Sequence, residues 1–292
     1  CALQGKKGFI TDIVDKTESP TTFSPDNVKE VLDDIRKDKS VNNVLLYINS
    51  GGGSVTASEK IRNMLVNFKK ETGKTLTVSM NGLAASGAYW ISTAADYVYA
   101  SPETITGSIG VFSLGISADK LLNEYGVYED GVETSELART SIAREMPQSQ
   151  KIEIQLSVES IYKKFITLAR NAHPEHQKVD YREFAEGRIF TVYDAKNLHL
   201  INDIDTFDNL IANAKKQIEK DKNTICKVKH FVPDGIDSQF ILKRLLSTHI
   251  QGLVSDNTLK KLLSWFDTAA VKGSNTQTPK IMATSAFTSI DL

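Results

Sequence analysis

The chain has few cysteines, no long apolar run and almost no net charge, and each shortage excludes a class of protein. Its 292 residues include two cysteines, Cys1 and Cys226, which lie far apart and lack the spacing of a metal site. No uninterrupted apolar run approaches the roughly 20 residues that span a bilayer. The formal net charge of −1 gives a nucleic-acid partner no support. The remaining composition, 40% apolar and 24% charged, is that of an ordinary globular protein.

Alternating strand and helix patterns in the first hundred residues predict an α/β domain. Apolar spacing predicts a helix over 26–37 and then a buried strand over 44–48. A second helix is expected over 54–70, with Gly73 just past its end, followed by a strand over 75–80. A helix running to about residue 95 and a strand over 97–100 come next. This order is typical of β-α-β units and a mostly parallel sheet.

The rest of the chain is predicted to be largely helical. We expect a helix over 116–125, an irregular segment over 126–146, and shorter helices near 181–185, 192–198 and 206–218. A long helix over 148–170 would bury Ile152, Leu156, Ile161, Phe165 and Leu168. We divide the chain into a domain over 1–220, a helical extension over 221–275 and a flexible tail over 276–292. The amphipathic segment 240–266 is expected to pack on the body or a neighbouring subunit, with a membrane surface as the alternative.

Two turns carry the candidate chemistry. A glycine turn over 49–54 follows the first strand, and a small-residue turn containing Ser86 follows the second. Both fall at the carboxyl ends of predicted parallel strands, where open α/β sheets bind ligands. The hydroxyl of Ser86 would face a substrate, and the amides of Gly53 and Gly87 would face a developing oxyanion. Taken alone, Ser86 is better explained as a small helix-capping residue that lets the helix pack closely on the sheet, because Ala-Ser-Gly is a weak motif. The glycine turn lacks the lysine of a phosphate-binding loop, which favours an oxyanion hole.

Three motifs, in order, resemble a known family. They are Leu-Tyr-Ile-Asn-Ser-Gly-Gly-Gly-Ser-Val-Thr-Ala-Ser-Glu at 46–59, Met-Asn-Gly-Leu-Ala-Ala-Ser-Gly-Ala-Tyr-Trp-Ile-Ser-Thr at 80–93 and Ser-Pro-Glu-Thr-Ile-Thr-Gly-Ser-Ile-Gly-Val-Phe at 101–112. With a looser match over 187–196, they resemble the C-terminal half of the long, two-domain signal peptide peptidase A (protease IV) family. The resemblance spans about residues 40–210. It implies a Clp/crotonase-like β-α-β superhelix with a mostly parallel sheet and a helical C-terminal extension.

The resemblance also implies a role for each matching residue. Ser86 corresponds to the family's nucleophile, Gly53 and Gly87 to its oxyanion donors, and Ser108 to a serine that hydrogen-bonds the catalytic lysine. That lysine is desolvated, which lowers its pKa and lets it act as the base. The segment where short members carry it, 127–146, contains no lysine, and Thr134 stands at about the expected position. Long members carry the lysine in their N-terminal half, so we expect the base to lie outside this chain.

Other titratable residues fit the role of the base less well. None of the five histidines lies about 25 positions after Ser86, the spacing of a Clp-type triad. His173 and His176, on either side of a Pro-Glu pair, are possible metal ligands. No third carboxylate or cysteine ligand is nearby, so no metal site is predicted. Lys120 follows the Ser108 motif on what reads as a solvated helix face, and we assign it no catalytic role.

The chain departs from the family pattern at five positions. Gly51 stands in place of proline, Ala88, Val192 and His199 in place of glycine, and Asn202 in place of aspartate. A β-branched residue where the backbone needs a positive φ would be strained. We therefore expect these changes to affect local geometry more than chemistry.

The function that the resemblance implies is hydrolysis of remnant signal peptides and similar apolar peptides by a Ser/Lys dyad, without a cofactor. Implied partners are the N-terminal half of the same protein and further copies of it in a homo-oligomer. The implied location is the periplasmic face of a bacterial inner membrane, reached through the missing N-terminal portion. Cys1 in place of methionine agrees with such a missing portion, and a lipoprotein cysteine is the alternative. Two other functions stay open: an inactive scaffold or binding homologue, and a crotonase-like acyl-CoA enzyme.

Overall fold

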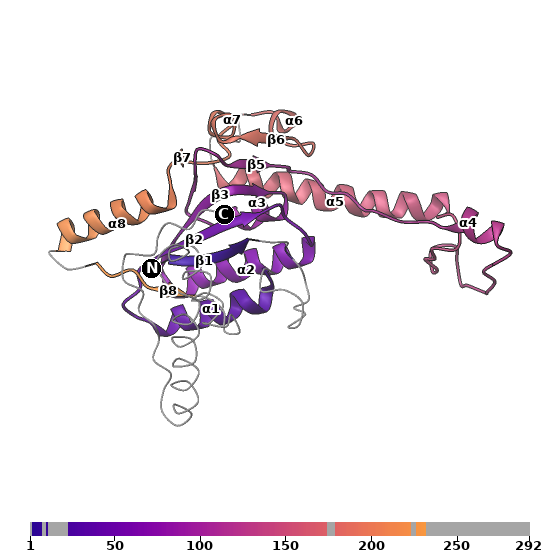
Figure 1. Ribbon diagram of the computed structural model, residues 1–292, viewed down its shortest axis with the longest axis horizontal. Coiled ribbons are helices and arrows are strands. Elements are labelled where there is room, and N and C mark those ends of the chain that lie inside the picture. Colours follow the sequence, from indigo (N-terminus) through magenta and orange to yellow (C-terminus); the bar gives the residue numbers. More distant parts are fainter. Residues whose placement is uncertain (1, 8–9, 11–22, 174–178, 223–225, 232–292) are drawn as a thin grey trace, which may run out of the picture.

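The computed structural model describes residues 2–7, 10, 23–173, 179–222 and 226–231, and it is built around one sheet (Figure 1). The eight strands of that sheet are β1 (Ala2–Lys7), β2 (Asn43–Ser50), β3 (Thr75–Ala85), β4 (Tyr97–Ala100), β5 (Ile105–Gly107), β6 (Ile189–Thr191), β7 (Asp203–Ile204) and β8 (His230–Phe231). The strand order is β6-β5-β3-β2-β1-β8, with β4 joining β3 to β7. Only the β5–β6 pair among these described strands is antiparallel. The predicted mostly parallel α/β architecture is confirmed.

Helices α1 (Pro25–Lys37) and α2 (Val55–Thr72) cover one face of this sheet (Figure 1). Each begins at a serine whose side chain accepts a hydrogen bond from the backbone, Ser24 from Asn27 and Ser54 from Ala57. Gly73 ends α2 in the left-handed conformation, as glycine past a helix commonly does. Both helices, predicted from their apolar spacing, are confirmed. They bury Val28, Val31, Leu32, Ile35, Ala57, Ile61, Leu65 and Phe68 in the main core.

One edge of strand β3 pairs with β2, and the other edge pairs with two different strands along its length. Its first part runs beside β4, and residues 83–85 run beside β5. Between these parts Gly82 has a φ of 69°, and the register against β2 shifts after the pair Ile48–Met80. The strand thus continues to Ala85 instead of ending at Met80 as predicted, because β5 supplies a second partner. Helix α3 (Gly87–Ser92) is correspondingly shorter than predicted, and all six of its residues are buried.

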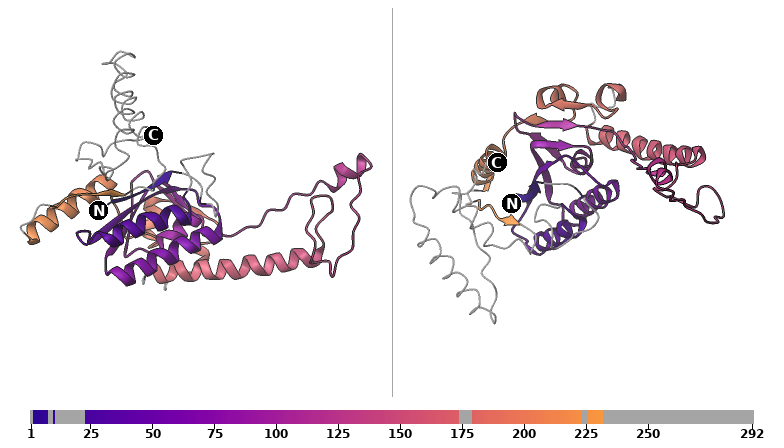
Figure 2. Two further views of the ribbon diagram at one scale, coloured as in Figure 1. Left: turned by 90° about the horizontal axis from the view of Figure 1, so that it is seen from below. Right: turned by 45° about the vertical axis from the view of Figure 1, so that its right-hand side comes forward.

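A long arm projects from the body between β5 and α6 (Figure 2, left). It contains α4 (Asp119–Glu124), an irregular segment and most of α5 (Gln148–Ala172), and all three were predicted near these bounds. The predicted buried face of α5 is correct only at its C-terminal end. Phe165 is 1% exposed, whereas Ile152 and Leu156 are 51% and 55% exposed, because the N-terminal half of α5 extends beyond the body of the protein.

The remaining described helices, α6 (Tyr181–Phe184), α7 (Val192–Asn197) and α8 (Phe207–Lys222), lie close to their predicted positions. Strands β1 and β8 were not predicted; they pair in parallel at one edge of the sheet. Of the predicted extension 221–275, the structure describes the end of α8 and residues 226–231. The amphipathic segment 240–266 and the tail 276–292 lie outside the described residues. Within the described part, no helix is long and apolar enough to cross a membrane.

Candidate active site at the ends of two strands

The glycine turn follows β2 and is held by Ile10. The amide of Ile10 donates to the Gly52 carbonyl at 3.0 Å, and the Ile10 carbonyl accepts from Ser54 at 2.9 Å. The amide of Gly52 donates to the Ser50 hydroxyl at 3.1 Å. A Cβ atom on Gly53 would lie 2.1 Å from the Ile10 carbonyl oxygen, so this close approach requires glycine. The turn is therefore fixed from one side, and its other side faces the serine turn.

Ser86 occupies an unusual backbone conformation between β3 and α3. Its φ of 52° and ψ of −119° are disfavoured for any residue with a Cβ atom, and such conformations cost about 1–3 kcal/mol. Two hydrogen bonds hold it there: its amide donates to the Gly107 carbonyl, and its carbonyl accepts from the Trp90 amide, each at 2.9 Å. Strain that the surrounding structure enforces is typical of functional positions.

The two turns meet. A Cβ atom on Gly52 would lie 2.7 Å from the Gly87 nitrogen and 2.9 Å from the Ser86 Cβ, and one on Gly87 would lie 3.3 Å from the Gly53 nitrogen. Among the described residues, neither the Gly53 nor the Gly87 amide has a hydrogen-bond acceptor. Two unpaired N–H groups thus lie at the junction of the glycine turn with Ser86. Such an arrangement can bind an oxygen that becomes negatively charged during a reaction.

Ser108 also lies beside this site. The strand register pairs Ala85 with Gly107, so Ser86 and Ser108 follow directly on neighbouring strands. Ser108 has a φ of 50° and donates its amide to the Arg188 carbonyl at 2.6 Å. The four predicted site residues, Ser86, Gly53, Gly87 and Ser108, therefore come together in space, although nothing in the structure tests their catalytic roles.

Thr134 is exposed and lies in the irregular segment of the arm between α4 and α5. Ion pairs hold the segment around it: Arg139 with Glu129 at 2.7 Å, and Arg144 with Glu133 at 2.8 Å. Lys120, on the same arm, is exposed as expected. Within the described part of the chain, no hydrogen bond joins the Ser86 hydroxyl to a lysine or a histidine.

The described residues also contain no cluster of three or more metal-ligating side chains. His173 is buried, and His176 lies outside the described residues.

The departures from the family pattern have different local effects. His199 adopts a φ of 56°, a conformation suited to glycine, whereas Val192 begins α7 without a positive φ, so the expectation of strain is wrong for Val192. Asn202 exchanges two hydrogen bonds with Val98: its side-chain oxygen accepts at 2.6 Å and its amide donates at 2.8 Å. The side-chain oxygen of Asn202 thus accepts a hydrogen bond that the carboxylate of an aspartate could also accept.

Sequence reasoning missed the side chains that anchor α3. The Tyr89 hydroxyl donates to the Leu200 carbonyl at 3.0 Å, and complete burial raises the pKa of Tyr89 far above its ordinary value. The Trp90 indole N–H donates to Glu59 at 2.8 Å, and its ring centroid lies 4.7 Å from that of Phe165. The sequence pointed to these anchoring residues only through their place in the family motifs: Glu59 ends the first motif, and Tyr89 and Trp90 lie inside the second.

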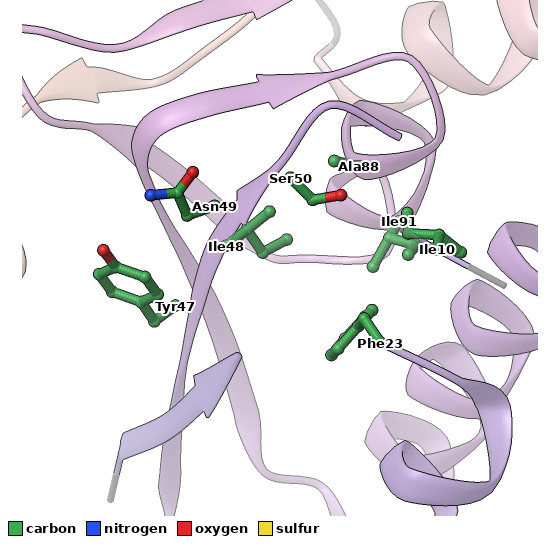
Figure 3. A pocket seen from close by; sticks show the side chains of 8 residues that line it. All are labelled: Ile10, Phe23, Tyr47, Ile48, Asn49, Ser50, Ala88 and Ile91. Carbon is green, nitrogen blue, oxygen red and sulfur yellow. The ribbon is translucent and has the colours of Figure 1, made fainter. Parts of the chain in front are cut away.

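A small recess of about 230 Å³ lies between the glycine turn and α3 (Figure 3). It is lined by Ile10, Phe23, Tyr47, Ile48, Asn49, Ser50, Ala88 and Ile91. Its lining is mainly apolar.

Comparison with known proteins agrees with this geometry. The profile of peptidase family S49 matches residues 68–221, more than half of the chain. The chain belongs to peptidase family S49. The Clp protease profile matches residues 17–106, in agreement with the Clp/crotonase-like α/β fold.

Curated S49 relatives are longer than this chain. Protease 4 of Salmonella typhi is 42% identical over 205 residues, which are 69% of this chain and 32% of that protein. The putative signal peptide peptidase SppA of Enterococcus faecium is 30% identical over 210 residues, 71% of this chain and 60% of that protein. The chain thus spans about a third of the former and less than two thirds of the latter. Among solved structures, a ClpP1 mutant from Listeria monocytogenes has a TM-score of 0.44 at 16% identity, covering 71% of this chain and 92% of that one.

Proposed function

We propose that this S49 chain supplies the nucleophile and the oxyanion hole of a serine peptidase. The observation that carries the proposal is the meeting of two unpaired amides, from Gly53 and Gly87, beside the strained Ser86. The amides come from different turns, yet both lie at the carboxyl end of the sheet. Acyl-transfer enzymes place N–H groups in this way where charge develops in the transition state.

The reaction would then proceed in two stages. The Ser86 oxygen attacks the carbonyl carbon of the scissile peptide bond while its proton passes to a lysine. Gly53 and Gly87 donate hydrogen bonds to the oxyanion, and the protonated lysine then gives its proton to the departing amine. Water, activated by the same lysine, hydrolyses the ester on Ser86. Removing one oxyanion donor typically costs about 100- to 1,000-fold in rate.

The lysine of this Ser/Lys dyad would come from outside the chain, from the N-terminal half of the same protein. The position matched to the short members' lysine is Thr134, an exposed residue in the irregular segment between α4 and α5. Among the described residues, the hydroxyls of Ser86 and Ser108 have no hydrogen-bond partner. Ser108 would orient the incoming lysine. The arm exposes apolar side chains, including Phe112 (85%) and Tyr125 (79%), which the proposed N-terminal half or another copy of the protein would cover.

The proposed substrates are extended, apolar peptides such as signal-peptide remnants. Leu83 and Ile105, 38% and 43% exposed, are paired in register on β3 and β5 shortly before the serine turn. They offer an apolar surface beside the reacting hydroxyl, and one relative is named as a putative signal peptide peptidase. Action at the periplasmic face of a bacterial inner membrane, in a homo-oligomer, is part of the proposal and rests on the family resemblance.

Covalent labelling tests the proposal. A fluorophosphonate probe should label Ser86 in the full-length protein that contains the lysine, and the same protein should hydrolyse an apolar peptide. Ser86→Ala should abolish both signals, whereas Ser40→Ala, at an exposed serine after α1, should retain them. The isolated chain should be at least about 100-fold slower, because it lacks the base.

Two results would contradict parts of this proposal. Rapid hydrolysis by the isolated chain, lost on Ser86→Ala, would place the base within this chain. Absence of labelling in the full-length protein would remove the peptidase assignment and favour a scaffold or an acyl-CoA enzyme, the latter to be sought by binding of acyl-CoA thioesters.

A further inference from the structure

The Glu59 carboxylate joins three helices. It accepts hydrogen bonds from the Trp90 indole N–H of α3 at 2.8 Å, from the Lys164 ammonium of α5 at 2.7 Å and from the Asn63 amide of its own helix α2 at 3.0 Å. The Glu59 side chain is 24% exposed, so these contacts are partly shielded from solvent. A single half-buried carboxylate thereby links the body helices to the helix of the arm.

These contacts keep Glu59 ionised. Burial alone would raise the pKa of Glu59, but the hydrogen bonds from Lys164, Trp90 and Asn63 outweigh it and hold the pKa below its ordinary value. Charge-assisted hydrogen bonds of this kind are stronger than those between neutral groups. At neutral pH the Glu59 carboxylate is therefore ionised and accepts a charge-assisted hydrogen bond from the Trp90 N–H.

Helix α3 has only six residues, and its orientation depends on side-chain contacts such as those of Trp90 with Glu59 and of Tyr89 with Leu200. Trp90 is directly connected to the serine turn, because its backbone amide donates to the Ser86 carbonyl. A shift of the indole would move Ser86 and the neighbouring Gly87 amide with it.

Glu59 also lies close to the other turn. It is in the second turn of α2, which begins directly after Gly53 and its cap Ser54. The Glu59–Trp90 hydrogen bond therefore ties the helix that follows one turn to the helix that follows the other.

We propose that Glu59 is a positioning residue of this site: by holding Trp90, it sets the spacing of the Gly53 and Gly87 amides and the orientation of Ser86. Lys164 of α5 supports this role, because its ammonium group holds the Glu59 carboxylate in place. This inference rests on the proposed peptidase function.

Steady-state hydrolysis of an apolar peptide by the full-length protein tests it. Glu59→Ala should lower kcat by about tenfold to a hundredfold with less than about a threefold change in KM, because a small misplacement affects the transition state most. Glu59→Gln, which retains an acceptor for Trp90, should restore most of the rate. Trp90→Phe, which keeps the ring against Phe165 but lacks the N–H, should reproduce the loss. Asp33→Ala, which breaks the ion pairs of Asp33 with Lys29 and Arg36 on α1, is the control and should leave kcat unchanged.

The possible failures are distinguishable. Wild-type protein without labelling or hydrolysis would remove the proposed function itself. Active wild-type protein with wild-type kcat in Trp90→Phe and Glu59→Ala would overturn the role of Glu59 alone. A lower melting temperature with unchanged kcat at 25 °C would mean that Glu59 only stabilises the fold. If Glu59→Ala fails to fold, Trp90→Phe and Glu59→Gln still decide the question.

Discussion

The two ends of α5 have opposite surroundings although they belong to one continuous helix. At the C-terminal end Phe165 packs against Trp90 and is 1% exposed, whereas Leu156 on the arm is 55% exposed. The apolar spacing of the helix is similar at both ends. Apolar periodicity therefore identifies the face that needs covering, but it does not say whether the covering surface belongs to the same chain.

Backbone strain is distributed as unevenly as burial. Within the described residues, the non-glycine residues with positive φ, Ser86, Ser108, Glu186 and His199, all lie in the body, and the arm uses Gly126 for its positive φ. A well-packed body can enforce costly conformations, whereas an arm with few contacts cannot. Among the described residues, enforced non-glycine conformations of this kind therefore belong to the body and not to the arm.

The largest expected effect comes from filling the junction of the two turns. Gly52→Ala would place a methyl group 2.7 Å from the Gly87 nitrogen, at a φ of 102°. We expect peptide hydrolysis by the full-length protein to fall by more than about 100-fold, because the methyl group occupies the space that the oxyanion needs. Gly73→Ala is the matched control: it also has a positive φ, of 65°, but nothing lies within 4 Å of its Cβ position. Equal losses of activity in the two variants would point to backbone strain as the cause.

A second pair of variants tests the comparison within α5. Phe165→Ala should destabilise the isolated chain by about 3–5 kcal/mol, because it leaves a cavity against α3. Leu156→Ala, in the same helix, should change stability by less than about 0.5 kcal/mol. Urea unfolding measures both values. A concentration-dependent loss in Leu156→Ala would show that the arm is already covered by another copy of the chain in solution.

The smallest expected effect concerns strain without function. His199→Gly should stabilise the protein by about 0.5 kcal/mol, because glycine removes the Cβ penalty of a left-handed residue but loses more entropy on folding. His199 is exposed, so little packing is lost. His199→Ala keeps the penalty and should give no gain. Thermal unfolding compares the variants, and a gain in both would assign the effect to the imidazole.

Much of the fold and the position of the site could be predicted from local signals. Apolar spacing predicted α1, α2 and β2, and Gly73 marked the end of α2. The family resemblance pointed to Ser86, Gly53, Gly87 and Ser108, and the structure brings these residues together. The parts that could not be predicted depend on distant partners. Strand β3 continues past Met80 only because β5 pairs with it.

The same limit applies to the anchors of the site. The role of Glu59 depends on Lys164, a residue more than one hundred positions away in the sequence. The exposure of Leu156 depends on a surface that the described chain does not supply.

The pairing of β1 with β8 has a consequence for synthesis. These strands come from opposite ends of the described chain, whereas β2 and β3 are separated by a single helix. Closing so large a loop is slow, and β8 leaves the ribosome after all the other described strands. Until then the β1 edge lacks this neighbour, and an open strand edge can pair with another chain. Nascent copies on one messenger RNA would therefore be at greatest risk of joining edge to edge just before β8 emerges.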